Sequence, residues 1–366
     1  MGTSNGIKGV ISVAVQIGDR IRLGRKLAGL SLRNLADKAA VSAQAISKYE
    51  RGLDIPSSPV LLRLARALGV KPEFFFRPEP LFALIPAYRK RARLKKKELE
   101  AVSARIQEWL ERYLELEYLA SAQVKFDRPA VGSTRAESLD EMEEAAVTVR
   151  QEWDLGLDPI QNLMELLEDR GIRVGLVEGF PHFDACAFWA DGVPVIAVKK
   201  DLPGDRQRFN LAHELAHLLF PEPGNPAGEA IAHRFAGAFL VPAQAVYQEL
   251  GRRRQSLGYR ELYLLKHKYG LSMQGWIARA RDLNIISPER ARYLFQDFRR
   301  QGWHKREPGK QLPPEEPKRM ERLALRAVAE GLISSSRAAE LLGKSMEEFR
   351  YQMMEEYGEP TTDLYN

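Results

Sequence analysis

The residues best placed to do chemistry in this sequence lie in the segment HELAH, at positions 213 to 217. On a helix, His213 and His217 lie four residues apart, so both imidazoles project from one face and can reach one metal ion. Glu214, beside the first histidine, is placed to act as general base toward a water molecule at that ion. Two imidazoles, a carboxylate and an open coordination position suit catalytic zinc, so the segment predicts Zn²⁺ as a cofactor.

The alternative to a metal site is an exposed helix that contains two histidines by coincidence. The chain has only six histidines in 366 residues, so chance would give this motif on the order of one per cent of the time. Three of the six fall within residues 213–233, and the neighbouring letters RFNLA and LLF supply an apolar face for burial. These observations favour the metal site.

A third metal ligand must come from another element. The segment GEAIAHRFAGAFLVP, which begins at Gly228, offers Glu229 and His233 one turn apart on one helical face. The loop before it is long enough for this helix to return antiparallel to the first. Glu229 would complete a His/His/Glu site and His233 a His-rich site. Whichever of the two does not bind the metal is expected beside the ligands, in a supporting role.

The elements around these helices predict a mainly α fold with a small β-sheet, in the α+β class. Helices are expected at 137–152 and 158–170, where Gly171 ends the second. The stretch IRVGLVEG then alternates like a strand. The stretch FDACAFWADGVPVIAV predicts a β-hairpin around Asp191-Gly192, a favoured tight-turn pair.

The letters RQRFNLAHELAHLLF followed by EAIAHRFAGAFLVP resemble the ImmA/IrrE family of metallopeptidases, which are gluzincin-like. That family pairs HExxH with a later helix of the form E-x-x-x-N-x-F-A, in which the Glu is the third ligand. The resemblance therefore implies Glu229 as the ligand. His233 departs from the pattern, because it stands where the family usually has Asn, and it either supplements or replaces Glu229.

This resemblance covers roughly residues 140–245 and implies a zinc-dependent endopeptidase that acts on a protein, often a repressor. The hairpin ending in VPVIAV is similar to the family's edge strand beside the site, which could hold an extended peptide by β-augmentation. The oxyanion stabiliser is unassigned. His182 is one candidate by its position just before the hairpin, and a solvent-exposed loop histidine is the simpler interpretation.

Charge is distributed unevenly along the chain, which has a net charge of +6. Residues 1–97 contain 20 Lys or Arg against 6 Asp or Glu, a net of +14, so the remainder carries −8. Such asymmetry predicts a nucleic-acid-binding module joined to a neutral or acidic one.

The basic part predicts a bundle of short helices over residues 17–76. Ser31 and Ser42 are natural N-caps for a second and a third helix, which are separated by a tight turn. The segment SLRNLADKAAVSAQAISKYERG resembles the Cro/CI-type (Xre) helix-turn-helix family, whose third helix enters the major groove of DNA. Carried over by position, the resemblance implies base contacts from Ser42, Ala43, Gln44, Ser47 and Lys48, and phosphate contacts from Arg33 and Arg51. Some members of this fold bind only protein.

The remaining segments are less informative. The run YRKRARLKKK could follow phosphates or could be the solvated start of a long helix over 95–122. That helix is expected to make an interdomain or dimer contact, and a homodimer is the default because such operators usually have two half-sites.

The expected order of domains along the chain is a tail, the helix-turn-helix domain, the connector with the long helix, the peptidase domain and a helical C-terminal region. The corresponding ranges are 1–16, 17–77, 78–136, 137–245 and 246–366.

Other features exclude some functional classes. One cysteine, Cys186, rules out an internal disulfide and fits a reducing cytosol. No apolar run approaches the roughly 20 residues of a membrane helix, and the N-terminus lacks a secretory signal, so a cytoplasmic location is expected.

We therefore expect a DNA-binding transcriptional regulator with a tethered zinc endopeptidase that cleaves a repressor, an antitoxin or the chain itself. The alternative is a transcription factor or antitoxin whose peptidase-like domain only senses a metal or ligand. An intact Glu214 argues against that alternative, because metal sensing needs no base beside the ligands.

Overall fold

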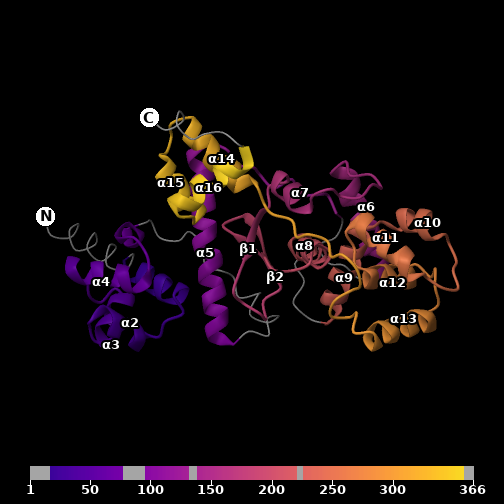
Figure 1. The fold of residues 1–366 in the computed structure, drawn as a ribbon, viewed down its shortest axis with the longest axis horizontal. Coiled ribbons are helices and arrows are strands. Elements are labelled where there is room, and N and C mark those ends of the chain that lie inside the picture. The colour runs from indigo at the N-terminus through magenta and orange to yellow at the C-terminus, as the bar shows by residue number, and fades with distance from the viewer. Residues whose placement is uncertain (1–16, 77–94, 132–137, 221–225, 358–366) are drawn as a thin grey trace. The chain divides into compact units, whose positions relative to one another are not determined.

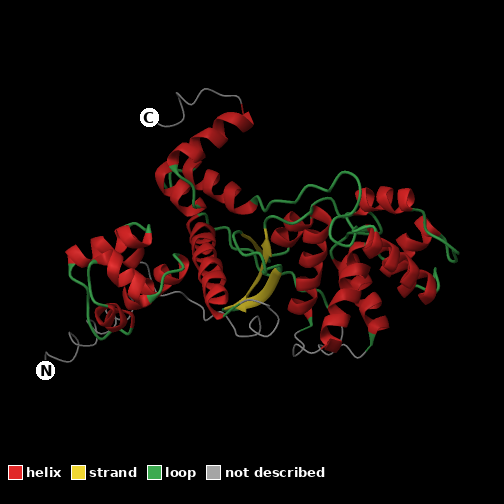
Figure 2. Ribbon diagram, turned by 60° about the horizontal axis from the view of Figure 1, so that its bottom comes forward, coloured by secondary structure: helices red, strands yellow, loops and turns green. Residues whose placement is uncertain are grey.

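The structure is a computed structural model that describes residues 17–76, 95–131, 138–220 and 226–357 (Figure 1). The chain divides into two compact units. The first contains residues 1–84 and 92–111, and the second contains residues 85–91 and 112–366. Most of the described chain is helical, with one three-stranded sheet (Figure 2). The predicted mainly α fold with a small sheet is confirmed. Among the described residues, no helix is both long and apolar enough to cross a membrane.

The first unit is a bundle of short helices around an apolar core. A helix over residues 17–27 is followed by α2 (Leu32–Ala39), α3 (Ala43–Glu50), α4 (Ser58–Leu68), the 3-10 turn η1 (Pro72–Phe76) and the start of α5 (Lys96–Leu119). The side chains with no exposure include Ile21, Leu35, Ile46, Leu64 and Phe75. The helix over 17–27 is joined to α3 by Arg25, whose guanidinium donates to both carboxylate oxygens of the buried Glu50 at 2.5 and 2.9 Å.

Local signals set the helix ends in this unit. The Ser31 side chain accepts from the backbone N–H of Asn34 at 3.1 Å, and the Ser42 side chain accepts from that of Ala45 at 3.0 Å. Both predicted N-caps are therefore confirmed. Between the two helices Ala40 adopts φ 51°, a left-handed conformation that reverses the chain in one residue.

The sheet of the second unit lies against the helix that carries the HELAH segment. The elements are α6 (Leu139–Glu152), α7 (Leu163–Asp169), β1 (Arg173–Val177), β2 (Ala185–Ala190), β3 (Val193–Lys199), α8 (Gly204–Leu219) and α9 (Pro226–Leu240). The strand order is β1-β3-β2, in which β1 is parallel and β2 antiparallel to β3. The predicted turn is confirmed, since Asp191 and Gly192 both have positive φ, 46° and 80°.

One predicted boundary in this region is wrong. The helix expected over 158–170 begins only at Leu163, because Asn162 caps it by accepting from the backbone N–H of Glu165 at 3.1 Å. The backbone carbonyls of Leu155, Gly156 and Asp158 accept instead from the buried Arg150 guanidinium, so the chain before Asn162 is held as a turn.

Four further helices extend the second unit: α10 (Ala243–Leu250), α11 (Tyr259–Tyr269), α12 (Met273–Asp282) and α13 (Pro288–Arg300). Helix α12 packs on α9 and α10. The buried Arg279 of α12 pairs with both carboxylate oxygens of Glu143 on α6 and donates to the carbonyl of Val241 at 3.1 Å. Gly237 of α9 leaves room for it, because a Cβ there would lie 2.9 Å from the Arg279 Cδ.

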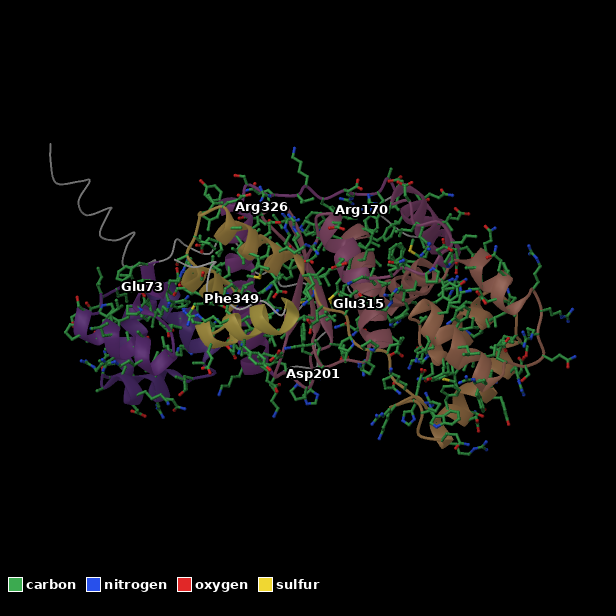
Figure 3. All side chains as sticks on the ribbon, turned by 45° about the horizontal axis from the view of Figure 1, so that its top comes forward. Glu73, Arg170, Asp201, Glu315, Arg326 and Phe349 are labelled. Carbon is green, nitrogen blue, oxygen red and sulfur yellow. The ribbon has the colours of Figure 1, made fainter. Side chains whose placement is uncertain are left out.

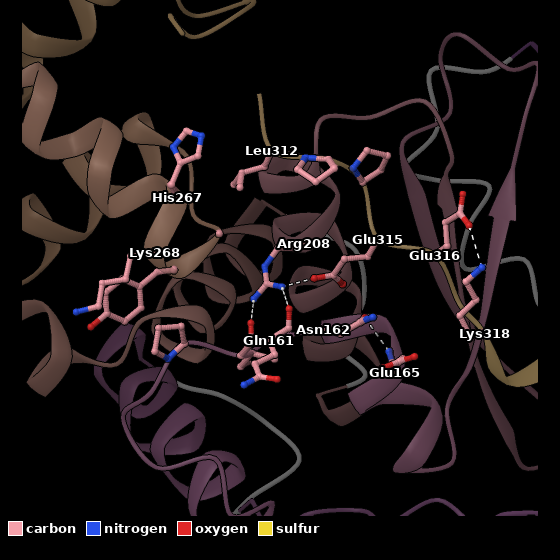
Figure 4. Close-up of a pocket in the computed structure, with 16 residues that line it drawn as sticks. Gln161, Asn162, Glu165, Arg208, His267, Lys268, Leu312, Glu315, Glu316 and Lys318 are labelled. Carbon is pink, nitrogen blue, oxygen red and sulfur yellow. Dashed lines mark hydrogen bonds and ion pairs between the residues drawn. The ribbon is translucent and has the colours of Figure 1, made fainter. Parts of the chain in front are cut away.

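Residues 301–318, which we call the strap, cross this unit without helix or strand and are held by two glutamates. Glu307 accepts from the backbone N–H groups of Met273 and Gln274, both at 3.0 Å, and pairs with the buried Lys266 at 3.0 Å. Glu315 accepts from the first two N–H groups of α7 at 2.9 and 3.0 Å. It also pairs with Arg208 (Figure 4). Each glutamate thus caps a helix and neutralises a buried cation.

The C-terminal helices pack on the second half of α5. They are α14 (Arg319–Ala329), α15 (Ser335–Leu342) and α16 (Met346–Tyr357). Their shared apolar cluster contains Leu116, Ala120, Leu323, Ala324, Ala338, Ala339, Leu341 and Phe349, the last of which is labelled in Figure 3. A buried polar group lies beside it, in which Tyr113 of α5 donates to Glu168 of α7 at 3.1 Å.

Candidate metal centre and nucleic-acid interface

Helix α8 places His213 and His217 on one face and buries the opposite one. The buried residues Leu211, Leu215 and Leu218 anchor α8 in the core of the unit. The two histidines lie at the edge of this core, with side chains 12% and 8% exposed. The helical spacing predicted from the sequence is therefore present.

Helix α9 returns beside α8 and brings Glu229 to the two histidines. The Nε2 atoms of His213 and His217 lie 3.1 Å apart. Oε2 of Glu229 lies 3.2 Å from Nε2 of His213, and Oε1 of Glu229 lies 3.8 Å from Nε2 of His217. All three ligand atoms fall within 4.8 Å of one another.

These separations fit a metal ion of the size and chemistry of Zn²⁺. Donor atoms placed tetrahedrally at about 2.1 Å from zinc lie roughly 3.4 Å from one another. The separation of 3.1 Å between the two Nε2 atoms, and the separations of 3.2 and 3.8 Å to the two different Glu229 oxygens, bracket that value. Two imidazole nitrogens and one carboxylate oxygen are also the donor types of catalytic zinc sites, which leave a fourth position open.

Glu214 lies on the side of α8 that faces the sheet and is 8% exposed. Burial raises the pKa of the Cys186 thiol on β2, and the negative charge of Glu214 raises it further by a smaller amount. Glu214 is therefore near β2, and the neighbouring thiol stays protonated. The sequence did not single out Cys186 for this position, because only the packing of α8 on β2 brings it there.

His233, the alternative third ligand, lies beside His213 without joining the cluster of ligand atoms. The rings of His213 and His233 are 4.7 Å apart, and the Phe209 ring stacks on His233 at 5.6 Å. The cluster of potential metal ligands contains Glu229 and not His233. Sequence reasoning missed Phe209, although its position four residues before His213 on one helix places it next to the site.

The second strand forms the edge of the described sheet next to α8. Its buried residues Cys186, Phe188 and Ala190 alternate with the half-buried Ala185, Ala187 and Trp189. His182 lies exposed in the turn before this strand. A separate cavity of about 690 Å³, beside the strap, contains none of the three clustered side chains in its lining (Figure 4).

The predicted DNA contacts lie on α2 and α3 of the first unit. Gln44 and Lys48 are exposed and one helical turn apart on α3, and Ser47 is half-buried beside them. The Ser42 hydroxyl caps the helix, and Ala43 follows it at the first helical position. Arg33 on α2 and Arg51 after α3 are both exposed, and the Arg51 Nε donates to the carbonyl of Ser47 at 3.1 Å.

Comparison with known protein families agrees with both regions. Residues 21–75 match a family described as helix-turn-helix, and residues 177–280 match one described as the IrrE N-terminal-like domain. The chain joins a helix-turn-helix domain to an IrrE-like domain. The resemblances to the Xre and ImmA/IrrE families are thereby confirmed. The IrrE-like match ends at the last turn of α12, so the family's domain continues past α9 into α10–α12.

Individual relatives match a small part of this chain. It is 32% identical over 68 residues to an HTH-type transcriptional regulator of Sinorhizobium medicae (strain WSM419), with 19% of this chain and 49% of that protein covered. It is 44% identical over 59 residues to an HTH-type transcriptional regulator of Mycobacterium tuberculosis (strain CDC 1551 / Oshkosh), with 16% and 42% covered. The chain thus spans about half the length of the curated relatives it matches.

Two other comparisons concern a human protein and a solved structure. Human endothelial differentiation-related factor 1 is 39% identical over 59 residues, with 16% of this chain and 40% of that protein covered. The solved structure of apo ComR from S. thermophilus aligns over 96% of this chain and 90% of its own, at 11% identity and a TM-score of 0.16. That TM-score is too low to support an argument about shape or function.

Proposed function

We propose that this protein is a DNA-binding transcriptional regulator whose IrrE-like domain is a zinc-dependent endopeptidase for a regulatory protein. The observation that carries the proposal is the convergence of His213, His217 and Glu229 beside the buried Glu214. A zinc peptidase needs at least three side chains that bind the metal ion and a general base next to them.

In this proposal, His213, His217 and Glu229 hold the metal. When bound, Zn²⁺ polarises the peptide carbonyl and makes water acidic enough to act as a nucleophile near neutral pH. Glu214 accepts the proton of the attacking water and then passes it to the leaving amine. Glu214 is buried, with the Cys186 thiol nearby, which limits the contact of this carboxylate with bulk water.

The edge strand supports a polypeptide substrate. The second strand pairs with the third on one side, and its other backbone edge lies at the border of the described sheet. An extended peptide that adds to this edge would gain backbone hydrogen bonds, while half-buried residues such as Ala187 and Trp189 contact its side chains. A repressor, an antitoxin or the chain itself is the expected substrate.

The helix-turn-helix domain supports binding to a double-stranded DNA operator. Gln44 and Lys48 are exposed on the helix that enters the major groove in this family, where Gln pairs with adenine and Lys with guanine or phosphate. Arg33 and Arg51 would contact phosphates, and the short Ser42, Ala43 and Ser47 would let the helix approach the base edges. We further propose a homodimer, to match an operator of two half-sites, and a cytoplasmic location.

A metal or ligand sensor is the second function to test. Its site would need the three metal donors but no base, so the buried Glu214 favours the peptidase. A DNA-binding antitoxin is the third candidate function. An antitoxin would form a complex with a small toxin encoded by a neighbouring gene.

The decisive experiment mixes the zinc-loaded protein with a second copy of itself and with repressors encoded nearby, alongside a Glu214→Gln variant. We expect the parent to cut one of these proteins and the variant to cut none, while both hold the same amount of zinc. If the parent cuts nothing while Gln44→Ala and Arg51→Ala each lose promoter binding, the protein is a sensor.

A further inference from the structure

The helical extension of the second unit carries a second concentration of positive charge. Residues 251–310 contain 15 Lys or Arg against 5 Asp or Glu, a net of +10. The preceding residues 98–250 contain 13 against 27, a net of −14. Charge is therefore separated within this unit, and the segment that contains α11–α13 is strongly basic while the metal centre lies in the acidic segment.

Part of this positive charge is used to stabilise the fold. Lys266 and Arg279 are buried and paired with carboxylates. Arg254, Arg281 and Arg300 pair with acidic neighbours at the surface. These cations have a structural role and leave little charge for a ligand.

Six arginines of the segment have no such role, and we call them the basic patch. They are Arg252, Arg253, Arg260, Arg292, Arg299 and Arg306, all of them exposed. None of the six forms an ion pair with any carboxylate in the part of the chain that the structure describes. Arg292 lies near the charge of Glu289, whose pKa it helps to lower, and the other five lack a paired carboxylate among the described residues. Exposed like charges repel one another, so keeping these arginines together costs stability unless an anion neutralises them.

Contacts between their elements place the segments that carry these arginines next to one another. The loop before α11 lies against the start of α13, because the Arg290 side chain donates to the Ser256 hydroxyl at 2.7 Å and the backbone N–H of Arg254 donates to the carbonyl of Ile285 at 2.8 Å. The first turn of α11 lies against the end of α13, because the Tyr259 ring contacts Phe298 and Trp303 at 5.8 and 5.2 Å. The segment that carries Arg252, Arg253 and Arg260 therefore lies along α13, which carries Arg292 and Arg299 and is followed by Arg306.

The arrangement of the guanidinium groups suits phosphate. Arg292 and Arg299 are seven residues apart on α13, so they point the same way about 10 Å from each other. Arg252 and Arg260 stack on Tyr247 and Tyr263 at 4.9 and 5.3 Å, which holds each guanidinium in place with its N–H groups free to donate. Arginine binds phosphate through two parallel hydrogen bonds, which lysine cannot do.

We infer that the basic patch binds the phosphate backbone of duplex DNA, as a second DNA contact outside the helix-turn-helix domain. An extended row of arginines matches a repeating anion better than a single small one. The chain already has a DNA-binding domain, so DNA is the polyanion to which this surface is tethered. A membrane surface is disfavoured, because an interfacial helix needs a continuous apolar face and α13 exposes Tyr293 between arginines.

The test uses the full chain with Arg33→Ala, Lys48→Ala and Arg51→Ala, so that the phosphate contacts assigned to the helix-turn-helix domain are removed, and duplex DNA without an operator. In this background we compare a patch variant, R292Q/R299Q/R306Q, with a control, R322Q/R326Q/R350Q. The control also removes three exposed arginines of the same unit and changes the net charge equally. Thermal unfolding of both confirms that they are folded.

Fluorescence anisotropy at several salt concentrations gives the slope of log Kobs against log[salt]. Each lost phosphate contact reduces the slope by about 0.9, so the patch variant is expected to lose about 2.7 and to bind tenfold or more weakly at about 0.1 M salt. We expect the control variant to show the same slope as the chain without the three control substitutions. Equal slopes for the patch variant and the control overturn the inference. It is also overturned if poly-glutamate or phosphatidylserine vesicles compete as strongly as DNA at equal charge.

Discussion

Replacing Glu315 by alanine removes a carboxylate that performs two tasks in the strap. It pairs with Arg208, whose side chain is 7% exposed, and it accepts from the backbone N–H groups of Leu163 and Met164 at the start of α7. Without it, the Arg208 charge is buried beside the carbonyl of Ile160, which it contacts at 2.7 Å, and the first turn of α7 has lost an acceptor.

The cost of each loss can be estimated. Removing one partner of a buried ion pair costs about 3–5 kcal/mol. The lower end applies, because Glu315 is 12% exposed and Arg208 keeps its contact with Ile160. The lost helix cap adds about 1 kcal/mol, so the expected total is about 4 kcal/mol. For a unit of this size, that lowers the unfolding temperature by roughly 8–16 °C.

The assay is thermal and urea unfolding followed by circular dichroism. The control is Glu316→Ala, because that neighbouring glutamate is 58% exposed and forms a surface ion pair with Lys318 at 3.5 Å. We expect the control to lie within about 0.5 kcal/mol of the parent. If Glu315→Ala unfolds no earlier than Glu316→Ala, the strap is not held by its glutamates and this reasoning is refuted.

Three further predictions concern pH, metal and DNA. Burial raises the pKa of Glu168 to about 7, so the folded state binds an extra proton and its stability falls as pH rises from about 4.5 through 7. Glu168→Gln should remove a change of about 3 kcal/mol, measured as urea midpoints at pH 5 and pH 8. Chelation of zinc should lower the unfolding temperature of the parent, since a ligand at 1,000 times its Kd stabilises by about 4 kcal/mol. His217→Ala should not respond to the chelator. Gln44→Ala should weaken operator binding by about 1–3 kcal/mol and leave binding to unrelated DNA unchanged, as measured by anisotropy.

Each of these has a contrary outcome. An unchanged pH dependence in Glu168→Gln would assign the titration to another group. An equal response of parent and His217→Ala to the chelator would place the stabilising metal elsewhere. Equal losses on operator and unrelated DNA would make Gln44 a phosphate contact instead of a base contact.

The sequence was most informative where local spacing determines the structure. The HELAH helix, the Asp191-Gly192 turn and the Ser31 and Ser42 caps depend on residues at most four positions apart. The family resemblance implied Glu229 as the third ligand, but spacing alone could not choose between Glu229 and His233, because both lie on one helical face. Only the tertiary structure brings the Glu229 carboxylate into the cluster of ligand atoms.

The rest of the second unit could not be predicted because its contacts are distant in sequence. Glu315 caps a helix that begins 152 residues earlier, and Glu307 neutralises Lys266, 41 residues earlier. No periodicity signals such pairs. The net charge of −8 over residues 98–366 did not reveal the charge separation, because it combines an acidic segment with the strongly basic residues 251–310.

The metal centre is the central claim, and zinc content tests it most directly. Purified Glu229→Ala and His233→Ala variants are compared with the parent by elemental analysis of zinc per chain. We expect the parent and His233→Ala to hold close to one equivalent of zinc and Glu229→Ala to lose most of it. Full zinc in Glu229→Ala, or none in the parent after growth with zinc, would contradict the assignment.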